Sequence, residues 1–525
     1  MRSTPLQGKM GESMKLKVKK LHFASGRPIA VLDDSTALGL GVRPHERIVL
    51  RCRGREVIAL VNVGWHIPSD VILVNDEVVD ALKVENGEEI EVVPTPPPES
   101  IEYIRDRLKG ARLSYREIKK IVEDIVYDRL SEIEIAALVA TIYQTGMGIE
   151  EAYYFSLAMV ETGNKLELNR TPILDKHSIG GVPGDKTTLI LVPTIASLGY
   201  TIPKTSSRAI TSPAGTADRA EVLMPVNLSL EEMKEVVQKT NGCIVWGGAL
   251  YLAPADDKII RVEYPLSIDP FLVPSIMAKK KAVGSTHLVI DIPVGRGAKV
   301  KTIGEAHYLA REMIEVGKRM GITVACALTF GEQPIGYTAG PALEAREALL
   351  TLMGKGPGDL IDKVTSIAGL LLSLVGVEKG KEVAKHAISK GKALTKLREI
   401  IETQGGDPKI SPDDIPIGDK KFTIYAENDG VILWMNNKLI ANIARLAGAP
   451  KDKGAGVLLH VKLGDSVKKG DPLITVVSEY STKLQTAEKV FEEQPVIGVG
   501  RPEEEMLVDI VPAPRPHERL PIIER

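Results

Sequence analysis

The segment from Asp175 to Thr188 places three polar side chains, Lys176, His177 and Ser178, directly before a pair of glycines. Apolar residues precede and follow it, which predicts a strand leading into a helix. Glycines let the backbone approach a ligand closely, and the free N–H groups at a helix start attract an anion. The segment therefore predicts a phosphate site, although it matches neither the Walker A sequence nor the GxGxxG fingerprint. A purely structural turn is the alternative.

A second segment is rich in hydroxyl groups. Six of the twelve residues from Thr205 to Thr216 carry one, and Arg208 lies among them. Hydroxyl groups and a guanidinium suit the oxygens of ribose and phosphate, because the guanidinium can bind two oxygens at once. An exposed Ser/Thr-rich loop is the alternative.

Two further segments combine charged residues with helix or strand ends. Asp269 stands before a proline and an expected helix, on which Ser275 and Lys279 are four residues apart and share one face. The segment from Asp291 to Lys299 is a strand running into a glycine loop, where ligands bind in α/β sheets. The alternatives are a capping carboxylate, solvated lysines and a plain strand-to-helix turn.

The composition is that of a globular protein with no excess of basic residues. The chain has 525 residues, 67 of them basic and 69 acidic, and a formal net charge of −2, which argues against a general nucleic-acid binder. Aromatic residues make up only 4%, too few to predict a base-stacking surface. Cys52, Cys243 and Cys326 lie far apart, so we expect no local metal site and no disulfide framework.

No run of 18 apolar residues is present, and residues 1–14 lack the apolar core of a signal peptide. We expect a soluble, cytoplasmic protein without membrane partners, and a loose tail over residues 1–14.

The elements that must position these residues fall into four parts. Residues 15–97 alternate short β-runs with turns and predict a β-barrel of the double-psi type, followed by a stiff proline linker. Residues 98–170 have a period of about 3.6 and predict a helical domain. Ser114 and Ser131 are expected N-caps, each with a glutamate three residues later.

Residues 171–252 and 283–420 alternate strands and helices, which predicts an α/β domain with a mostly parallel sheet. One expected helix covers residues 184–198. Residues 421–525 are β-rich, and residues 456–476 form two strands with Gly-Asp turns. That rhythm is similar to a lipoyl or biotinyl carrier domain, but a structural β-element is the better interpretation because no Met-Lys-Met signal is present.

The four polar segments, in this order, resemble the thymidine and pyrimidine-nucleoside phosphorylase family. The most specific motif is Asp175-Lys-His-Ser-x-Gly-Gly, and the resemblance covers most of the chain from about Lys109. It includes Gly331–Glu347 and Gly456–Ser478.

Several departures indicate a separate branch of that family. Pro183 is an insertion, the second segment is rich in hydroxyl groups, and Glu263 stands where the thymidine enzymes carry a base-contacting arginine. The β-rich residues 15–97 are also additional. These features resemble an archaeal branch that uses phosphate to split AMP into adenine and ribose 1,5-bisphosphate in nucleotide degradation. CMP and UMP are further candidate substrates.

The resemblance implies a role for each matching residue. Asp269 would be the catalytic proton donor, and His177 and Lys279 are further candidates. The implied phosphate-binding residues are Lys176, Ser178, Thr188 and Thr216. The implied AMP-binding residues are Gly181, Ser207, Arg208, Ala209, Ile210, Thr211, Ser212, Thr216, Ser275 and Lys299.

The resemblance also implies that residues from about 253 to 282 join the helical domain, and that substrates bind between two lobes. Phosphate is a co-substrate, and neither a cofactor nor a metal is expected. Arg208 or Lys299 is expected to bind the 5′-phosphate of AMP. The N-terminal barrel is expected to support a homo-oligomer.

Three alternatives remain open from the sequence. The chain could be a pyrimidine-nucleoside phosphorylase, or a phosphoribosyltransferase of related fold, which would need Mg²⁺ and pyrophosphate chemistry. It could also be a non-catalytic nucleotide-binding or assembly protein. The intact Lys176-His177-Ser178 sequence argues against the last.

Overall fold

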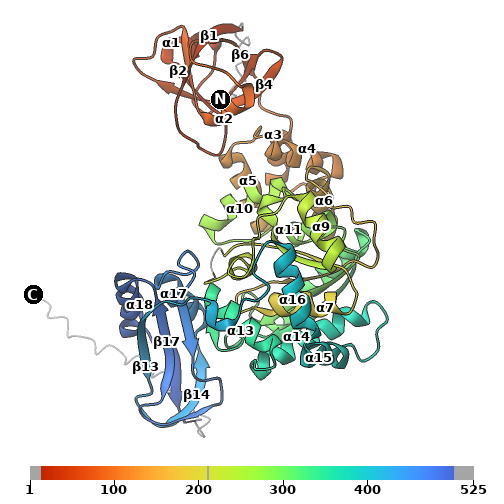
Figure 1. Ribbon diagram of the computed structural model, residues 1–525. Helices are drawn as coiled ribbons and strands as arrows, with labels where there is room; N and C mark the ends of the chain where they lie inside the picture. Colours follow the sequence, from red (N-terminus) through yellow and green to blue (C-terminus); the bar gives the residue numbers. More distant parts are fainter. Residues whose placement is uncertain (1–12, 210–211, 502–525) are drawn as a thin grey trace, which may run out of the picture.

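The structure is a computed structural model that describes residues 13–209 and 212–501. A β-barrel, a helical bundle with an α/β domain, and a C-terminal β-domain follow one another along the molecule (Figure 1). Within the described residues, no helix is both long and apolar enough to cross a membrane.

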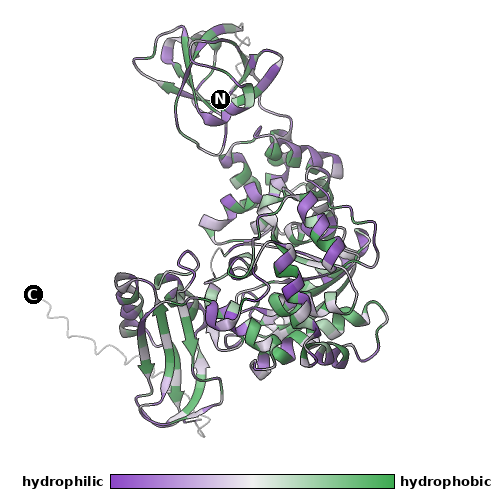
Figure 2. Cartoon of the chain, viewed as in Figure 1, coloured by the Kyte–Doolittle hydropathy of each residue, from purple (hydrophilic) through white to green (hydrophobic). Residues whose placement is uncertain are grey.

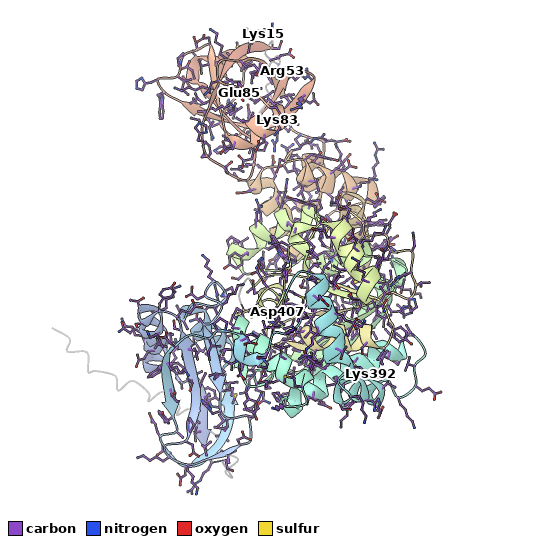
Figure 3. The ribbon with its side chains drawn as sticks, in the orientation of Figure 1. Lys15, Arg53, Lys83, Glu85, Lys392 and Asp407 are labelled. Carbon is purple, nitrogen blue, oxygen red and sulfur yellow. The ribbon has the colours of Figure 1, made fainter. Side chains whose placement is uncertain are left out.

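The N-terminal part is a closed barrel in the strand order β1-β5-β2-β4-β3-β6. Its strands are β1 (Met14–Lys20), β2 (Ile29–Asp33), β3 (Arg47–Cys52), β4 (Arg55–Gly64), β5 (Val71–Val74) and β6 (Glu89–Thr95). Two short helices, α1 (Asp34–Leu40) and α2 (Asp76–Leu82), connect them. Leu32, Ile48 and Leu50 are buried in its apolar core, and charged side chains such as Lys15 and Arg53 lie outside (Figure 3). The prediction of a barrel is confirmed.

Two details of the barrel differ from the prediction. The loose tail was expected to include Met14, but Met14 pairs with Val92 in the antiparallel ladder between β1 and β6. Residues 1–12 lie outside the described part. Strand β5 was not predicted, because its four consecutive apolar residues show no alternation.

The helical domain contains α3 (Ser100–Leu108), α4 (Tyr115–Val126), α5 (Glu132–Thr145) and α6 (Ile149–Glu161). The capping boxes Ser114/Glu117 and Ser131/Glu134 both form, as predicted. Two later helices, α10 (Pro254–Leu266) and α11 (Leu272–Ala282), pack in the same apolar core, where the rings of Phe155 and Phe271 meet edge to face at 5.0 Å.

The α/β domain contains β7 (Leu174–Ser178), β8 (Ile202–Ser206), β9 (Gly242–Trp246), β10 (His287–Val294) and β11 (Thr323–Phe330). All their ladders are parallel, in the orders β11-β10-β7 and β8-β9, and a bridge between Ile173 and Thr201 joins the two groups. The helices are α7 (Thr187–Ser197), α8 (Thr216–Ala220), α9 (Leu230–Thr240), α12 (Ile303–Arg319), α13 (Pro341–Leu352), α14 (Gly358–Ser373), α15 (Gly380–Ser389) and α16 (Lys392–Thr403).

The sheet is covered on both faces. Along β10, Leu288, Ile290 and Ile292 enter the core shared with the helical bundle, and Val289 enters the core formed with α7, α13 and α14. The helix expected from residue 184 begins only at Thr187, because Gly184 has a φ of 77° and the chain is still a loop there.

The C-terminal domain is built on antiparallel sheets, as predicted, with two unpredicted helices. Its elements are β13 (Lys420–Tyr425), β14 (Gly430–Met435), α17 (Asn437–Leu446), β15 (Gly456–Leu459), β16 (Ser466–Val467), β17 (Pro472–Ser478), α18 (Ser481–Glu493) and β18 (Ile497–Gly500). Strand β12 (Thr338–Ala339), from the preceding part of the chain, adds to the sheet beside β15. Hydrophobic strands run through this domain in Figure 2.

Candidate active site

Three of the polar segments identified from the sequence, the first, second and fourth, begin within β7, β8 and β10 and continue beyond the carboxyl ends of these strands. Because parallel strands end at the same edge of a sheet, their following loops gather there. Ser178, the last residue of β7, is paired with Asp291 in β10. The structure therefore brings these predicted segments to one edge.

The loop after β7 lies against the loop after β10. Gly180 and Gly181 have φ values of 82° and 91°, which favour glycine. A Cβ atom on Gly181 would overlap the backbone nitrogen of Lys299. This close contact brings the predicted phosphate loop next to Lys299.

Asp291 is a fully buried carboxylate that gathers groups from three other elements, β7, β11 and α14. It accepts hydrogen bonds from Ser178 Oγ at 2.8 Å and from Thr329 Oγ1 at 2.6 Å. Lys363 Nζ, from α14, lies 3.0 Å from it, and Lys176 Nζ lies 3.7 Å away. Asp291 thus fixes two of the predicted phosphate-binding residues, Ser178 and Lys176.

Lys176 is almost completely buried and lies between two carboxylates, because Asp185 Oδ2 is 3.5 Å from its Nζ. Burial alone would raise the pKa of Asp185, but Lys176, Lys363 and Arg219 hold it well below its usual range. An incoming phosphate would therefore find cations that are already oriented by fixed negative charges.

A second buried carboxylate, Asp175, lies in β7 shortly before the same loop. Lys280 Nζ donates to Asp175 Oδ2 at 2.8 Å, and Lys204 Nζ lies 3.9 Å from the other oxygen of Asp175. Burial, and then Lys280, Lys204 and Lys176, keep the pKa of His177 well below its usual value. His177 is thus neutral at pH 7, in a region of positive potential that favours an anion.

The remaining predicted phosphate-binding residues lie at helix starts. Thr188 is the second residue of α7 and is buried, and Thr216 is the first residue of α8 and is half-buried. Asp218 holds the loop before α8 by accepting from the backbone N–H groups of Ala209 at 2.6 Å and Gly215 at 2.9 Å.

Arg208 is already matched by carboxylates. Its guanidinium donates to both oxygens of Glu221, at 2.6 and 2.9 Å, and to Asp218 at 3.2 Å, and it stacks on Trp246. Arg208, followed by Lys453 from the C-terminal domain, lowers the pKa of Glu221 to about 2. The guanidinium is therefore fixed in place and has no uncompensated positive charge.

Three other predicted AMP-binding residues of this segment lie on either side of residues 210–211. Ser207 is exposed, Ala209 and Ser212 are half-buried, and Ser212 Oγ donates to Ala214 O at 3.2 Å. Ile210 and Thr211 lie outside the described residues.

Asp269 and Lys299 form an ion pair of 3.2 Å between the two lobes. Asp269 lies in the connection between α10 and α11 of the helical bundle, and Lys299 in the loop after β10. Their side chains are 43% and 48% exposed, so solvent and ligands can reach both. The expected proton donor and the expected cation are thus direct neighbours.

Glu263, in the last turn of α10, is a buried carboxyl group close to that pair. Its Oε1 accepts from the backbone N–H of Phe271 at 3.1 Å. Burial, followed by the charge of Asp269, raises the pKa of Glu263 to about 8. The group therefore holds a proton at neutral pH.

Ser275 and Lys279 lie one turn apart on α11, as predicted. Lys279 Nζ is 2.5 Å from Asp256 Oδ2 at the start of α10. Burial alone would lower the pKa of Lys279, but Asp256 and Asp257 raise it, so the lysine is a cation.

From the sequence, no role was assigned to Asp291 or Lys363, and the protonated state of Glu263 was not predicted. A signal existed for the first two. Asp291 interrupts the apolar run of β10, and Lys363 occupies the apolar stripe of α14 beside Leu360, Val364 and Ile367.

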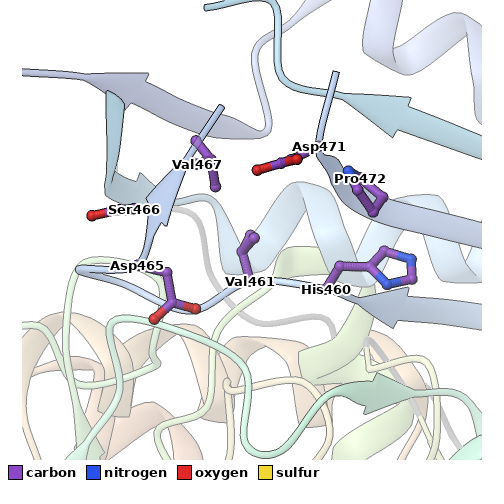
Figure 4. A pocket seen from close by; sticks show the side chains of 7 residues that line it. All are labelled: His460, Val461, Asp465, Ser466, Val467, Asp471 and Pro472. Atoms are coloured by element: carbon purple, nitrogen blue, oxygen red, sulfur yellow. The ribbon is translucent and has the colours of Figure 1, made fainter. Parts of the chain in front are cut away.

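A separate hollow lies within the C-terminal domain (Figure 4). His460, Asp465 and Asp471 are among the residues that line it, and His460 Nε2 is 2.8 Å from Thr475 Oγ1. None of the predicted site residues takes part in it.

The known family models that match this chain cover separate parts of it, and these parts correspond to domains of the fold. Residues 101–163 match the helical bundle domain of a glycosyl transferase family, and residues 170–394 match the a/b domain of that family. Residues 431–498 match the pyrimidine nucleoside phosphorylase C-terminal domain.

Similar proteins extend over nearly the whole chain. The AMP phosphorylase of Thermofilum pendens is 55% identical over 93% of this chain and 96% of its own. The AMP phosphorylase of Pyrococcus furiosus is 49% identical over 90% of this chain and 95% of its own. Among solved structures, anthranilate phosphoribosyltransferase from Thermus thermophilus covers 57% of this chain and 98% of its own, with 19% identity and a TM-score of 0.49.

Replacing Lys363 by Met should weaken the binding of inorganic phosphate about tenfold, or by about 1.4 kcal/mol. In this variant Lys176 is the cation that still lies near Asp291. Asp291 then attracts the Lys176 ammonium more strongly and draws it away from the bound phosphate. Calorimetric titration with phosphate measures the change. Lys381→Met is the control, since Lys381 of α15 forms an exposed pair with Asp362 of α14, the helix that carries Lys363. Equal phosphate affinity in Lys363→Met and the wild type would contradict this role.

Glu263→Gln should change how stability depends on pH. The pKa of Glu263 is raised on folding from 4.5 to about 8, so its stabilising effect is complete below pH 4.5 and is lost as pH rises through 8. The Gln variant should therefore gain stability relative to the wild type between pH 5 and 9, by at most a few kcal/mol. Unfolding midpoints measure this difference, and Glu378→Gln, an exposed site, should show none. A constant offset at every pH would refute the buried, protonated state.

Proposed function

Because the chain belongs to the AMP phosphorylase family, we propose that it cleaves AMP with inorganic phosphate to give adenine and ribose 1,5-bisphosphate. The observation that carries this proposal is the contact between Gly181 and Lys299, which sets the phosphate loop against the Asp269–Lys299 pair. The proposed phosphate loop and the proposed acid, Asp269, are then both direct neighbours of Lys299. CMP and UMP remain further proposed substrates.

The phosphate is proposed to bind between Lys176, Ser178, Thr188 and Thr216. Asp291 and Lys363 keep Ser178 and Lys176 in position, so little reorganisation is needed when phosphate binds. Holding the phosphate in line with the C1′–N bond turns a bimolecular attack into a step within one complex.

Asp269 is proposed to protonate adenine as it leaves. The bond between C1′ and the base breaks through an oxocarbenium-like state, and the base would otherwise depart as an anion. A positioned acid typically speeds such a step by roughly 10²–10⁴-fold. Closure of the bundle lobe on the α/β lobe would exclude water and so favour phosphorolysis over hydrolysis.

Lys299 is the proposed ligand of the 5′-phosphate, in preference to Arg208. Both were candidates from sequence, but Arg208 is held by Glu221 and Asp218, whereas the one carboxylate that pairs with Lys299 in the described part of the chain is the exposed Asp269. A dianionic phosphate competes well with one exposed carboxylate and poorly with two carboxylates that already bind the guanidinium.

The alternatives have less support. The two relatives from Thermofilum pendens and Pyrococcus furiosus, which match over at least 90% of this chain, are named AMP phosphorylases rather than nucleoside phosphorylases or phosphoribosyltransferases. A non-catalytic binding protein would not need a buried carboxylate that orients Ser178 and Lys176 so closely.

Release of free base tests the function. The protein is incubated with AMP or with adenosine, each with and without phosphate, and adenine is quantified. We expect adenine from AMP only when phosphate is present, and little from adenosine. Activity on uridine or adenosine but not on AMP would instead assign the chain to nucleoside phosphorolysis.

Assembly and location are also proposals. The barrel exposes Trp65 (82%) and Leu38 (80%), which supports a homo-oligomer formed through that domain. The free thiols of Cys52, Cys243 and Cys326 support a reducing, cytoplasmic location.

Replacing Trp65 and Leu38 together by Ser should lower the solution mass measured by light scattering, because an apolar contact is lost. The matched control is Leu433→Ser, since Leu433 is an exposed leucine of the C-terminal domain. An unchanged mass in the barrel variant would exclude these two residues from the interface.

A further inference from the structure

Lys299 stands in a tight turn over residues 295–300, directly after β10. The backbone N–H of Gly295 donates to Val300 O at 3.2 Å, and that of Ala298 donates to Gly295 O at 3.0 Å. These two bonds close the turn, so the position of Lys299 depends on what the turn lies against.

Two neighbours of this turn belong to the α/β domain. On one side is the phosphate loop, because a Cβ atom on Gly181 would overlap Lys299. On another side is the segment that follows β11, where Glu332 Oε1 accepts a hydrogen bond from Arg296 N at 3.1 Å. Gly331, the first residue of that segment, donates its N–H to the last carbonyl of β10 at 2.9 Å. The turn and the segment are therefore tied to the same strand.

A third neighbour comes from the C-terminal domain. Asn437 is the first residue of α17, which lies on the side of that domain facing the α/β domain (Figure 1). Its side chain is fully buried, and its Nδ2 donates to Gly331 O at 2.8 Å. The three atoms nearest to a Cβ built on Gly297 all belong to the Asn437 side chain, at 2.6, 3.1 and 3.2 Å. Asn437 thus contacts the turn two residues before Lys299 and also holds the segment on which the turn lies.

The amide of Asn437 is only half satisfied. Its Oδ1 is buried and accepts no hydrogen bond from the described residues. A buried acceptor without a donor costs stability. Packing alone therefore gives no reason for an amide at this place, whereas the bond to Gly331 does.

We propose that Asn437 is a positioning residue for nucleotide binding, which sets, from the C-terminal domain, the turn that presents Lys299 to the 5′-phosphate of AMP. This inference rests on the proposed function, in which Lys299 binds that phosphate. The C-terminal domain then takes part in substrate recognition without contacting the substrate. Lys176 and Ser178, on the side of inorganic phosphate, are fixed by Asp291 instead and do not depend on Asn437.

The test begins with Asn437→Ala, which removes the bond to Gly331. KM for AMP should rise about tenfold, while kcat and KM for phosphate change less than about threefold, because the lost interaction serves the binding of AMP and not the chemical step. Steady-state kinetics with each substrate varied in turn gives the three values. Calorimetric titration with AMP should show the same tenfold loss of affinity.

The matched control is Asn436→Ala, one residue earlier. Asn436 is the N-cap of α17, and its Oδ1 accepts from the backbone N–H of Leu439 at 3.1 Å. Its replacement should lower the unfolding temperature, because a helix cap is lost, and leave KM for AMP unchanged. An equal rise of KM in both variants would show that Asn437 only supports the helix, and would overturn the positioning role.

Gly297→Ala tests the contact from the other side. Gly297 does not have a positive φ, so an alanine there is limited by the space next to Asn437 rather than by its backbone. KM for AMP should rise about tenfold when this change is made in the wild type, and less than about threefold when it is made in Asn437→Gly, which removes the overlap. The same rise in both backgrounds would show that the two residues act independently, and would contradict the proposal.

Failure of this inference can be told apart from failure of the proposed function. If Asn437→Ala keeps the wild-type KM and affinity for AMP and still releases adenine, the positioning role is wrong and AMP phosphorolysis stands. If the wild type releases no adenine from AMP in the presence of phosphate, both are wrong.

Discussion

The site depends on one buried charge, the carboxylate of Asp291 within β10. A charge removed from water is tolerated only when cations and hydrogen-bond donors surround it. Asp291 meets this need with Ser178 from β7, Thr329 from β11 and Lys363 from α14, and Lys176 lies nearby. The same contacts that satisfy Asp291 fix the groups that are proposed to hold phosphate, so the stability of the sheet edge and the geometry of the site have a common origin.

The two halves of the proposed reaction lie on different lobes. The phosphate side belongs to a parallel sheet covered on both faces, which favours a rigid site. The acid side, with Asp269 and Glu263, belongs to the connection between two helices of the bundle. The exposed pair of Asp269 and Lys299 is one of the contacts between the lobes, and an exposed ion pair is weak enough for a substrate to exchange.

The sequence predicted what local patterns determine. The capping boxes at Ser114 and Ser131, the alternation of strands and helices, and the polar segments at strand ends all depend on neighbours a few residues apart. It could not predict pairings across long separations. The partner of Lys363 is 72 positions away at Asp291, and Arg208 is bound by Glu221, which Lys453 reaches from 232 positions away. The raised pKa of Glu263 depends on burial in the folded bundle and on the charge of Asp269, and no local pattern in α10 records that burial.

The central claim is that this site transfers the ribose of AMP to phosphate, and ³¹P NMR of the reaction mixture tests it most directly. The account predicts that, with AMP and phosphate present, the free-phosphate signal falls while two ester signals appear, from a phosphate on C1 and a phosphate on C5 of the same ribose. A single new ester signal from ribose 5-phosphate, with free phosphate unchanged, would show hydrolysis and contradict the account.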